Sequence, residues 1–452
     1  MSRKYFGTDG VRGRVGTAPL TPDFALKLGW AAGRVLGGGK PGARVLIGKD
    51  TRRSGYLFES ALEAGFSAAG MDVGLLGPIP TPGVSVLTQA LKAQAGVVIS
   101  ASHNPHYDNG VKFFGADGGK LNDEVEQRIE AMLEQELRCV EPEQVGAARR
   151  VAEARDVYVS HCLVAYRGPR LSGLKIVMDC ANGAGYQTGP EVLEKLGAKV
   201  VAIHNHPDGF NINESCGSTH LQSLCDAVLA EKADLGIALD GDGDRCLMVD
   251  DQGREVDGDE ILYILANERL RQQILQGPVV GTLMSNLGLE NALKGRGVVF
   301  RRAKVGDRYV LEMLKAEGGT LGGETSGHTL CLDRSNTGDG TVTALQVLEV
   351  LAQSGRTLRE LIDGMHKYPQ VLINVPVVGK AAPVLESEPV KASVRQAEAE
   401  LGQRGRVLLR ASGTEPLVRV MVEAEAQSLA ENSARMIADR VREAANTLAA
   451  AA

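Results

Sequence analysis

Three acidic residues, Asp240, Asp242 and Asp244, alternate with glycines directly after an apolar run. Glycine lets the backbone turn tightly, so carboxylates at positions i, i+2 and i+4 can converge on one cation. Oxygen ligands without nitrogen or sulfur favour Mg²⁺, which would take a further oxygen from a phosphate. An EF-hand calcium loop is excluded, because its sixth and twelfth positions are Arg245 and Asp251. A solvated acidic turn is the remaining alternative, although three close carboxylates repel one another.

Ser102 follows a second apolar run, residues 95–99, and precedes an Asn-Pro pair. If this run is a strand of a parallel sheet, Ser102 lies beyond its carboxyl end, where such folds bind ligands, and it is the candidate nucleophile. Lys112 supplies a cation near the same loop, and Arg245 beside the aspartates can bind a phosphate. Arg12, after a glycine-rich N-terminal loop, could join such a site. An ordinary polar turn is the alternative for both loops.

A glycine-flanked loop carries Glu324, Ser326 and His328. Its carboxylate and hydroxyl can present an acceptor and a donor to adjacent sugar hydroxyls, and the histidine could hydrogen-bond or relay a proton. Lys304 lies upstream in the same region. Taken alone, the pattern favours an ordinary loop for this segment and a solvated lysine for Lys304.

Arg410 and Arg419 bracket a turn formed by Ser412, Gly413 and Thr414. Backbone N–H groups of such a turn form a nest for an anion, and the arginines add charge-assisted hydrogen bonds to phosphate oxygens. The pattern therefore favours a phosphate site. A surface hairpin with incidental arginines is the alternative.

Each of these loops follows a short apolar run, and the runs alternate with segments of helical periodicity. The pattern predicts three α/β units, each with a mixed or largely parallel sheet. After residue 370 it changes to strand, helix, two strands and helix, which predicts a smaller α+β domain. We expect four domains. Residues 1–155 carry Ser102 and residues 156–255 carry the three aspartates. Residues 256–367 carry the loop that could bind sugar hydroxyls, and residues 368–452 carry the turn that could bind phosphate.

The composition narrows the class of protein. A length of 452 residues is enough for two to four domains. The net charge of −6 gives no global positive field, so neither nucleic acid nor an anionic membrane is an expected partner. Seven scattered cysteines without a CxxC pair indicate reduced thiols in the cytoplasm. No leader-like N-terminus and no 18-residue apolar run is present, so secretion and membrane spanning are not expected.

Together the four loops, in this order, resemble the α-D-phosphohexomutase superfamily. The Ser-His-Asn-Pro motif at Ser102 and the Asp-Gly-Asp-Gly-Asp-Arg motif at Asp240 carry the resemblance most specifically, and it extends over essentially the whole chain. It implies four domains around a central cleft, with a C-terminal domain that opens and closes it. The implied enzyme is an isomerase that converts glucosamine 6-phosphate to glucosamine 1-phosphate, which feeds UDP-N-acetylglucosamine and peptidoglycan precursor synthesis. Glucose or mannose phosphates are alternative substrates, and a catalytically idle sugar-phosphate sensor is disfavoured because the complete reactive set is present.

The resemblance also implies roles for individual residues. Ser102 would be phosphorylated and, with the three aspartates, would hold Mg²⁺, while Arg12, Lys112 and Arg245 would stabilise the transferring group. Sugar hydroxyls would bind Lys304, Glu324 and Ser326, and the second phosphate would bind Arg410, Ser412, Gly413, Thr414 and Arg419. Glucosamine 1,6-bisphosphate, or glucose 1,6-bisphosphate, would be the intermediate or activator. The general base stays open among His103, Lys112 and His328, and a homodimer is possible.

Overall fold

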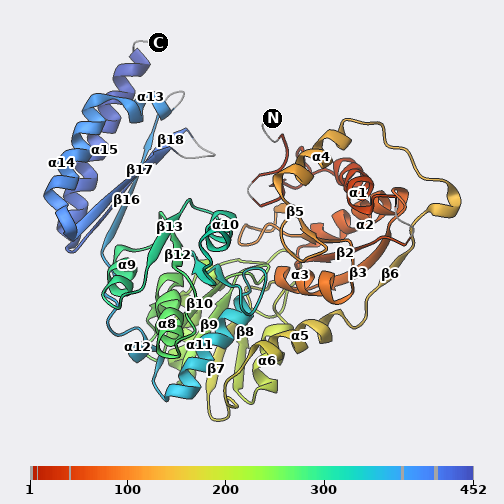
Figure 1. Cartoon of the computed structure of the whole chain (residues 1–452), viewed down its shortest axis with the longest axis horizontal. Helices are drawn as coiled ribbons and strands as arrows, with labels where there is room; N and C mark the ends of the chain where they lie inside the picture. The colour runs from red at the N-terminus through yellow and green to blue at the C-terminus, as the bar shows by residue number, and fades with distance from the viewer. Residues whose placement is uncertain (1–3, 8, 40–41, 378–380, 412–415, 451–452) are drawn as a thin grey trace. The chain divides into compact units, whose positions relative to one another are not determined.

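The computed structural model describes residues 4–7, 9–39, 42–377, 381–411 and 416–450 (Figure 1). The chain forms two compact units. The first comprises Met1–Thr282 and Ala303–Ile362, and the second comprises Leu283–Arg302 and Asp363–Ala452. None of the helices among the described residues is long and apolar enough to cross a membrane.

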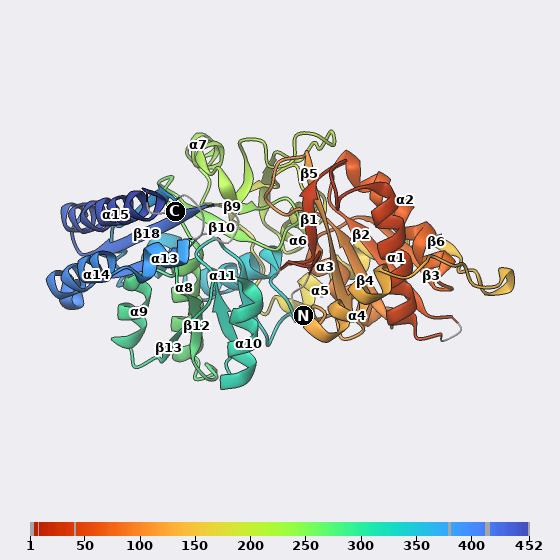
Figure 2. The same ribbon diagram turned by 90° about the horizontal axis from the view of Figure 1, so that it is seen from above.

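The first part of the larger unit is built on a mixed six-stranded sheet in the order β1-β5-β4-β2-β3-β6. Strands β4, β2, β3 and β6 are parallel, whereas β5 runs antiparallel to both β4 and β1. Helices α1 and α2 pack against each other, and α1 also contacts α4 (Figure 2). The bounds of these elements are β1 Val11–Arg14, α1 Pro22–Gly37, β2 Arg44–Lys49, α2 Arg53–Ala68, β3 Asp72–Pro78, α3 Thr81–Ala90, β4 Ala95–Ile99, β5 Asp108–Gly115, α4 Asp123–Leu133, η1 Pro142–Gln144 and β6 Ala148–Arg150.

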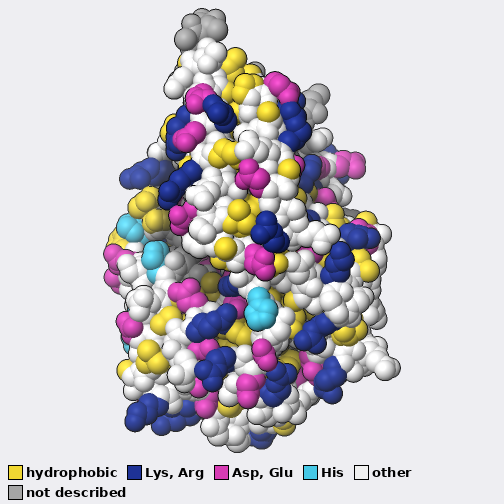
Figure 3. All heavy atoms as spheres, turned by 90° about the vertical axis from the view of Figure 1, so that its left-hand side faces the viewer, with side chains coloured by type: hydrophobic (Ala, Val, Ile, Leu, Met, Phe, Trp, Pro, Cys, Tyr) yellow, Lys and Arg dark blue, Asp and Glu magenta, His cyan; other side chains and the backbone are white. Residues whose placement is uncertain are grey.

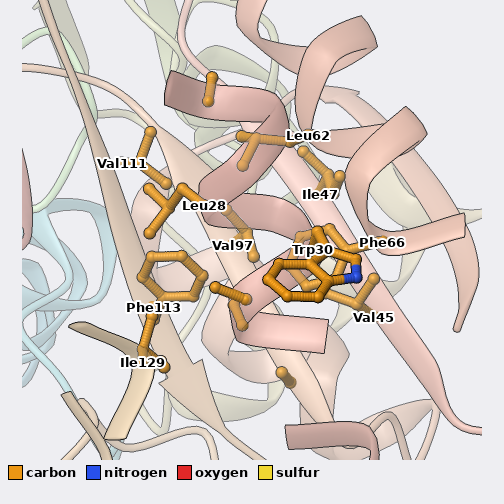
Figure 4. Packing of buried hydrophobic residues seen from close by; sticks show 14 of the residues in the cluster. Leu28, Trp30, Val45, Ile47, Leu62, Phe66, Val97, Val111, Phe113 and Ile129 are labelled. Atoms are coloured by element: carbon orange, nitrogen blue, oxygen red, sulfur yellow. The ribbon is translucent and has the colours of Figure 1, made fainter. Parts of the chain in front are cut away.

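Hydrophobic side chains from α1, α2, α4 and the sheet form one continuous core (Figure 4). Trp30 is 4% exposed, and its indole N–H donates to the Arg138 carbonyl over 2.9 Å. Two glycines let α1 and α2 approach closely. A Cβ on Gly29 would lie 2.6 Å from the carbonyl oxygen of Leu62, and a Cβ on Gly65 would lie 2.7 Å from the backbone nitrogen of Trp30.

The second layer is a five-stranded sheet in the order β11-β10-β9-β7-β8. Strands β8, β7 and β9 are parallel, and β10 returns antiparallel along β9. The carboxyl ends of the three parallel strands therefore meet at one edge, where α/β sheets bind ligands. The bounds are α5 Ala154–Ala165, β7 Lys175–Asp179, α6 Thr188–Lys195, β8 Lys199–Ile203, η2 Gly217–Thr219, α7 Gln222–Glu231, β9 Leu235–Leu239, β10 Cys246–Asp250 and β11 Glu255–Val256.

In the third layer, β12 pairs with β14 in parallel and β14 with β15 antiparallel. Side chains cap its helices: Asp257 and Glu260 form a capping box on α8, and Asp339 accepts from the Val342 N–H at the start of α11. The bounds are α8 Gly258–Arg271, β12 Val279–Thr282, α10 Asp307–Glu317, β14 Leu321–Gly323, β15 Thr329–Cys331, α11 Gly340–Ser354 and α12 Leu358–Leu361. The segment Leu283–Arg302 of the smaller unit contains α9 Leu287–Lys294 and most of β13 Phe300–Ala303.

The C-terminal part of the smaller unit is an antiparallel sheet, β16-β18-β17, packed against α14 and α15 (Figure 1). Its core is separate and is built mainly from valines and alanines. The predicted change to a smaller α+β domain is confirmed. The bounds are β16 Gln370–Pro376, α13 Ala381–Glu386, α14 Glu388–Leu401, η3 Gly402–Arg404, β17 Gly405–Ala411, β18 Leu417–Ala424 and α15 Gln427–Ala450.

The apolar run at residues 95–99 has the bounds of β4, and the run before Asp240 is β9. The antiparallel strands β5 and β10 were not predicted. Lys112 consequently lies within β5, opposite Val98 of β4, rather than in the Ser102 loop. On the molecular face in Figure 3, acidic and basic side chains are interspersed, and no broad field of one sign is seen among the described residues drawn there.

Candidate active site

Ser102 lies in a buried turn between β4 and β5, with its backbone in the left-handed region at a φ of 52°. Its N–H donates to the Ser100 hydroxyl over 2.9 Å, and its carbonyl accepts from the Asn213 amide over 2.9 Å. The hydroxyl donates to Asp240 Oδ2 over 2.5 Å and lies 3.3 Å from His103 Nδ1. The turn thus holds the candidate nucleophile against the acidic loop of the second sheet.

The three aspartates follow β9 and converge, with one oxygen of each within 4.8 Å of the others. Burial, with the charges of Asp244 and Asp242, raises the pKa of Asp240. Buried Oδ1 atoms of Asp242 and Asp244 have no hydrogen-bond partner among the described residues. Because unpartnered buried carboxylate oxygens are costly, this donor set fits a hard divalent cation such as Mg²⁺.

Lys112 extends from β5 into the same site and is 3% exposed. Its ammonium lies 2.8 Å from Asp242 Oδ2 and 3.0 Å from Asp9 Oδ2. Burial opposes its charge, but Asp242 and Asp9 outweigh burial and raise the pKa of Lys112. At Asp242, burial alone would raise the pKa of the carboxyl, but the charge of Lys112 outweighs burial and lowers it. Lys112 is therefore a fixed cation beside the acidic cluster.

Two arginines and a neutral histidine lie beside the aspartates. Arg245 follows the aspartates, with its Nε 4.0 Å from Asp244 Oδ1, and Arg12 on β1 pairs with Asp9. Burial, followed by the charges of Arg245 and Arg12, lowers the pKa of His103 to about 4. His103 is thus neutral at pH 7 next to the Ser102 hydroxyl.

His328 is buried between two carboxylates, with Nδ1 3.5 Å from Asp244 Oδ2 and Nε2 3.4 Å from Asp307 Oδ2. Burial opposes protonation, but the two aspartates outweigh it and raise the pKa of His328 to about 9. The imidazole is therefore a cation at pH 7. Lys120 forms ion pairs with Asp307 and, at 2.6 Å, with Asp9 Oδ1.

A cavity of about 430 Å³ opens above these side chains, a size within the usual range for small-molecule sites. It is lined by Arg12, Ser102, Arg245, Glu324 and His328 together with Asp9, Asp244 and Asp307. Among the described residues that line this cavity, neither Lys304 nor Ser326 is found. Lys304 is exposed over the Tyr309 ring, and the sugar-binding roles of both residues stay predictions.

Arg410 and Arg419 lie directly opposite each other on β17 and β18. Burial and the charge of Arg419 lower the pKa of Arg410. Two facing cations favour an anion between them. Ser412, Gly413 and Thr414 lie outside the described residues.

Sequence reasoning missed three charged residues of the site, Asp9, Lys120 and Asp307. Asp9 lies three residues before Arg12, and this spacing of an acidic and a basic residue could have indicated the ion pair between them. Lys120 lies in the loop after β5, and Asp307 is the first residue of α10. The two residues are 187 positions apart, and no local sequence pattern indicates their contact.

Comparisons with known proteins bear on the whole chain. Four family models match successive segments: phosphoglucomutase/phosphomannomutase alpha/beta/alpha domains I, II and III at residues 3–138, 156–253 and 257–368, and the C-terminal domain at 372–440. A phosphoglucosamine mutase of Thioalkalivibrio sulfidiphilus is 59% identical over 449 residues, which cover 99% of each chain. One of Cronobacter sakazakii is 57% identical over 443 residues, covering 98% of this chain and 99% of that one.

This chain belongs to the phosphoglucosamine mutase family. Solved structures of other phosphohexomutases have the same fold. A phosphoglucomutase/phosphomannomutase family protein from Burkholderia thailandensis has a TM-score of 0.81 and 25% identity, covering 98% of this chain and 97% of its own. An N-acetylphosphoglucosamine mutase from Aspergillus fumigatus, solved with GlcNAc-6P and magnesium, has a TM-score of 0.69 and 20% identity, covering 98% and 96%. The resemblance predicted from the loops is confirmed at the level of the phosphoglucosamine mutase family.

Proposed function

We propose that this chain interconverts glucosamine 6-phosphate and glucosamine 1-phosphate. The observation that carries the proposal is the Ser102 hydroxyl, 2.5 Å from Asp240 within a converging aspartate triad and at the wall of a cavity that Arg12 and Arg245 also line. The identity to phosphoglucosamine mutases over nearly the whole chain supports the amino sugar as substrate. Phosphoryl transfer requires mainly positioning and charge stabilisation, which these side chains can supply.

The reaction begins with a phosphoryl group on the Ser102 oxygen. The O1 hydroxyl of glucosamine 6-phosphate attacks this phosphorus, so an O1–P bond forms while the serine O–P bond breaks. The product is glucosamine 1,6-bisphosphate, which turns within the cavity. The Ser102 oxygen then attacks the 6-phosphorus, so a serine O–P bond forms again while the O6–P bond breaks. O6 regains the proton from the general base, and glucosamine 1-phosphate leaves.

Asp240, Asp242 and Asp244 would hold Mg²⁺, which supplies positive charge to the transferring phosphoryl oxygens. Arg12 and Arg245 bind those oxygens from the cavity wall. Glu324 lines the cavity and can accept from a sugar hydroxyl. Arg410 and Arg419 bind the phosphate that is not transferred, with the help of Ser412, Gly413 and Thr414.

Of the three candidate general bases, His103 fits best. Its Nδ1 lies 3.3 Å from the Ser102 oxygen at which the phosphoryl group is transferred. Lys112 and His328 are instead each held between two carboxylates as cations. His103 would take the proton of the attacking sugar hydroxyl, and His328 would contribute positive charge.

In this mechanism, residues 1–155 carry the nucleophilic serine and residues 156–255 the metal-binding aspartates. Residues 256–367 bind the sugar, and residues 368–452 bind the phosphate that is not transferred. It places the protein in the cytoplasm, where its seven free thiols stay reduced. A homodimer remains a prediction that light scattering can check.

The test is a coupled assay of glucosamine 1-phosphate formation with Mg²⁺ and a trace of glucose 1,6-bisphosphate. Ser102→Ala should lose at least ~10³-fold in kcat and the phosphoryl group that mass spectrometry detects on the wild-type serine. Ser85→Ala removes another buried hydroxyl, bonded to the Gly118 carbonyl, and serves as the matched control. Retained turnover in Ser102→Ala would refute the phosphoserine route, and a higher kcat/KM on glucose or mannose 1-phosphate would refute the amino-sugar assignment.

A further inference from the structure

A second cluster of side chains with metal-binding chemistry lies at the edge of the five-stranded sheet. Asp179, His204 and Cys216 bring a carboxylate oxygen, an imidazole nitrogen and a sulfur within 4.8 Å of one another. Asp179 ends β7, His204 directly follows β8, and Cys216 precedes η2. None of the three has a role in the phosphoryl transfer proposed above.

The backbone holds the three side chains in place. The carboxylate of Asp179 accepts from the N–H of Ala181 and from the N–H of Gly217, each over 2.8 Å. The carbonyl of His204 accepts from the N–H of Asn182 over 2.6 Å. The segments that carry the histidine and the cysteine are thus both tied to the turn after β7, which preorganises the cluster.

The carboxylate of Asp179 holds the imidazole of His204 and raises its pKa, and their spacing also suits two ligands of one cation. Oδ2 and Nδ1 lie 3.1 Å apart, yet the buried Nδ1 has no hydrogen-bond partner among the described residues. Lone pairs on both atoms are therefore able to point at a third centre. Ligand atoms around one tetrahedral zinc lie about 3.3 Å apart, given metal–ligand distances of about 2.0 Å.

Cys216 supplies the ligand that selects the class of metal. Its side chain is fully buried, so a substrate cannot reach the sulfur, which argues against a Cys-His-Asp nucleophile. Thiolate and imidazole favour a borderline-soft cation such as Zn²⁺ over Mg²⁺ or Ca²⁺.

We propose that Asp179, His204 and Cys216 bind a zinc-class divalent cation at a structural site separate from the aspartate triad. The site is coupled to the Ser102 turn through Asn213. The N–H of Asn213 donates to the Ala181 carbonyl, and its side-chain amide donates to the carbonyl of Ser102 over 2.9 Å. Cation binding therefore stiffens a loop that supports the turn of the candidate nucleophile.

Cobalt is the probe that separates the two metal sites. Chelator-treated full-length protein is titrated with Co²⁺ in excess Mg²⁺, and absorption spectra are recorded. We expect one equivalent to give a near-ultraviolet thiolate-to-cobalt charge-transfer band together with the intense visible bands of tetrahedral cobalt. Carboxylate ligands alone, as in the aspartate triad, give no thiolate band. Zn²⁺ should displace the cobalt and raise the melting temperature.

Matched variants identify the ligands. Cys216→Ser and His204→Asn should abolish the charge-transfer band and weaken Zn²⁺ by more than the ~10–100-fold that loss of an outer-shell partner costs. Asparagine suits position 204 because the backbone there has a φ of 45°. Cys180→Ser and His206→Asn are the controls, since the Cys180 thiol contacts the Met178 carbonyl and His206 is exposed.

The outcomes are distinct. A band that is retained in both controls and lost in the two cluster variants supports the site. No thiolate band in the wild type overturns the proposal, as does a band that Cys216→Ser leaves intact. If Cys216→Ser fails to fold by circular dichroism, His204→Asn decides alone. These results do not depend on turnover, so they stand apart from the assay of the mutase reaction.

Discussion

Ser102 Oγ donates to Asp240 Oδ2 over 2.5 Å, although the two residues are 138 positions apart and follow strands of different sheets. This bond sets the serine at the rim of the aspartate cluster, where two buried carboxylate oxygens have no hydrogen-bond partner among the described residues. Asp240 is buried, and burial and the neighbouring aspartates raise its pKa. The site is thus poised to gain stability from a cation.

Asp240→Asn should change stability and activity in opposite directions. Removing one of three repelling carboxylates should stabilise the protein in a chelator by about 1 kcal/mol, while Mg²⁺ should no longer raise the melting temperature. Turnover should be lost because the cation site is incomplete. Differential scanning fluorimetry with and without Mg²⁺ checks this. A variant that Mg²⁺ still stabilises as strongly as the wild type would exclude Asp240 as a ligand.

Lys120→Met tests the ion pairs with Asp9 and Asp307. Loss of the ammonium leaves two mostly buried carboxylates facing each other, and we expect a loss of about 1–3 kcal/mol in the free energy of unfolding by urea. Lys4→Met is the matched control, because its pair with Glu134 at 3.0 Å is exposed and should leave the unfolding curve unchanged. Equal effects of both variants would contradict the role of burial.

Asp339→Asn should alter the pH dependence of stability. Burial raises the pKa of Asp339 to about 6 from an ordinary 3.8, although it accepts from Tyr158 and from the Val342 N–H. The folded state binds the proton more tightly, so this group costs stability as pH rises from about 4 to about 6. The variant should therefore gain roughly 3 kcal/mol relative to the wild type between pH 4 and pH 7.

The control for this prediction is Asp208→Asn, which should behave in the opposite way. Backbone N–H groups of Phe210 and Asn211 lower the pKa of Asp208, so its contribution is present at neutral pH and is lost as pH falls through the lowered value. Urea unfolding at several pH values measures both differences. A flat difference for Asp339→Asn would mean that the pKa of the carboxyl is the same in the folded and unfolded states.

Gly65→Ala should separate α1 from α2. The new Cβ would meet the Leu26 carbonyl oxygen and the Trp30 nitrogen, and we expect a loss of about 2–3 kcal/mol. Gly55→Ala lies on the same helix, where the Cβ would be 3.4 Å from the Lys49 side chain, which is an ordinary van der Waals contact. That control should be neutral or up to ~1 kcal/mol more stable, because alanine favours helix. Comparable losses at both positions would disprove the packing argument.

The local sequence determined much of this protein. The apolar runs before Ser102 and Asp240 set β4 and β9, and the Gly-Asp alternation after β9 identified the acidic cluster, because strand periodicity and glycine turns depend on near neighbours. The order of the four loops indicated the family, which the full-length relatives confirm.

Only the tertiary structure decided which charges meet. Lys112 reached the aspartates because β5 returns along β4, and Lys120 met Asp307 across 187 residues. The protonation of His328 and the cluster of Asp179, His204 and Cys216 follow from the same kind of contact. Such contacts depend on how separate strands share a sheet edge, and short-range patterns carry no record of the distance between distant residues.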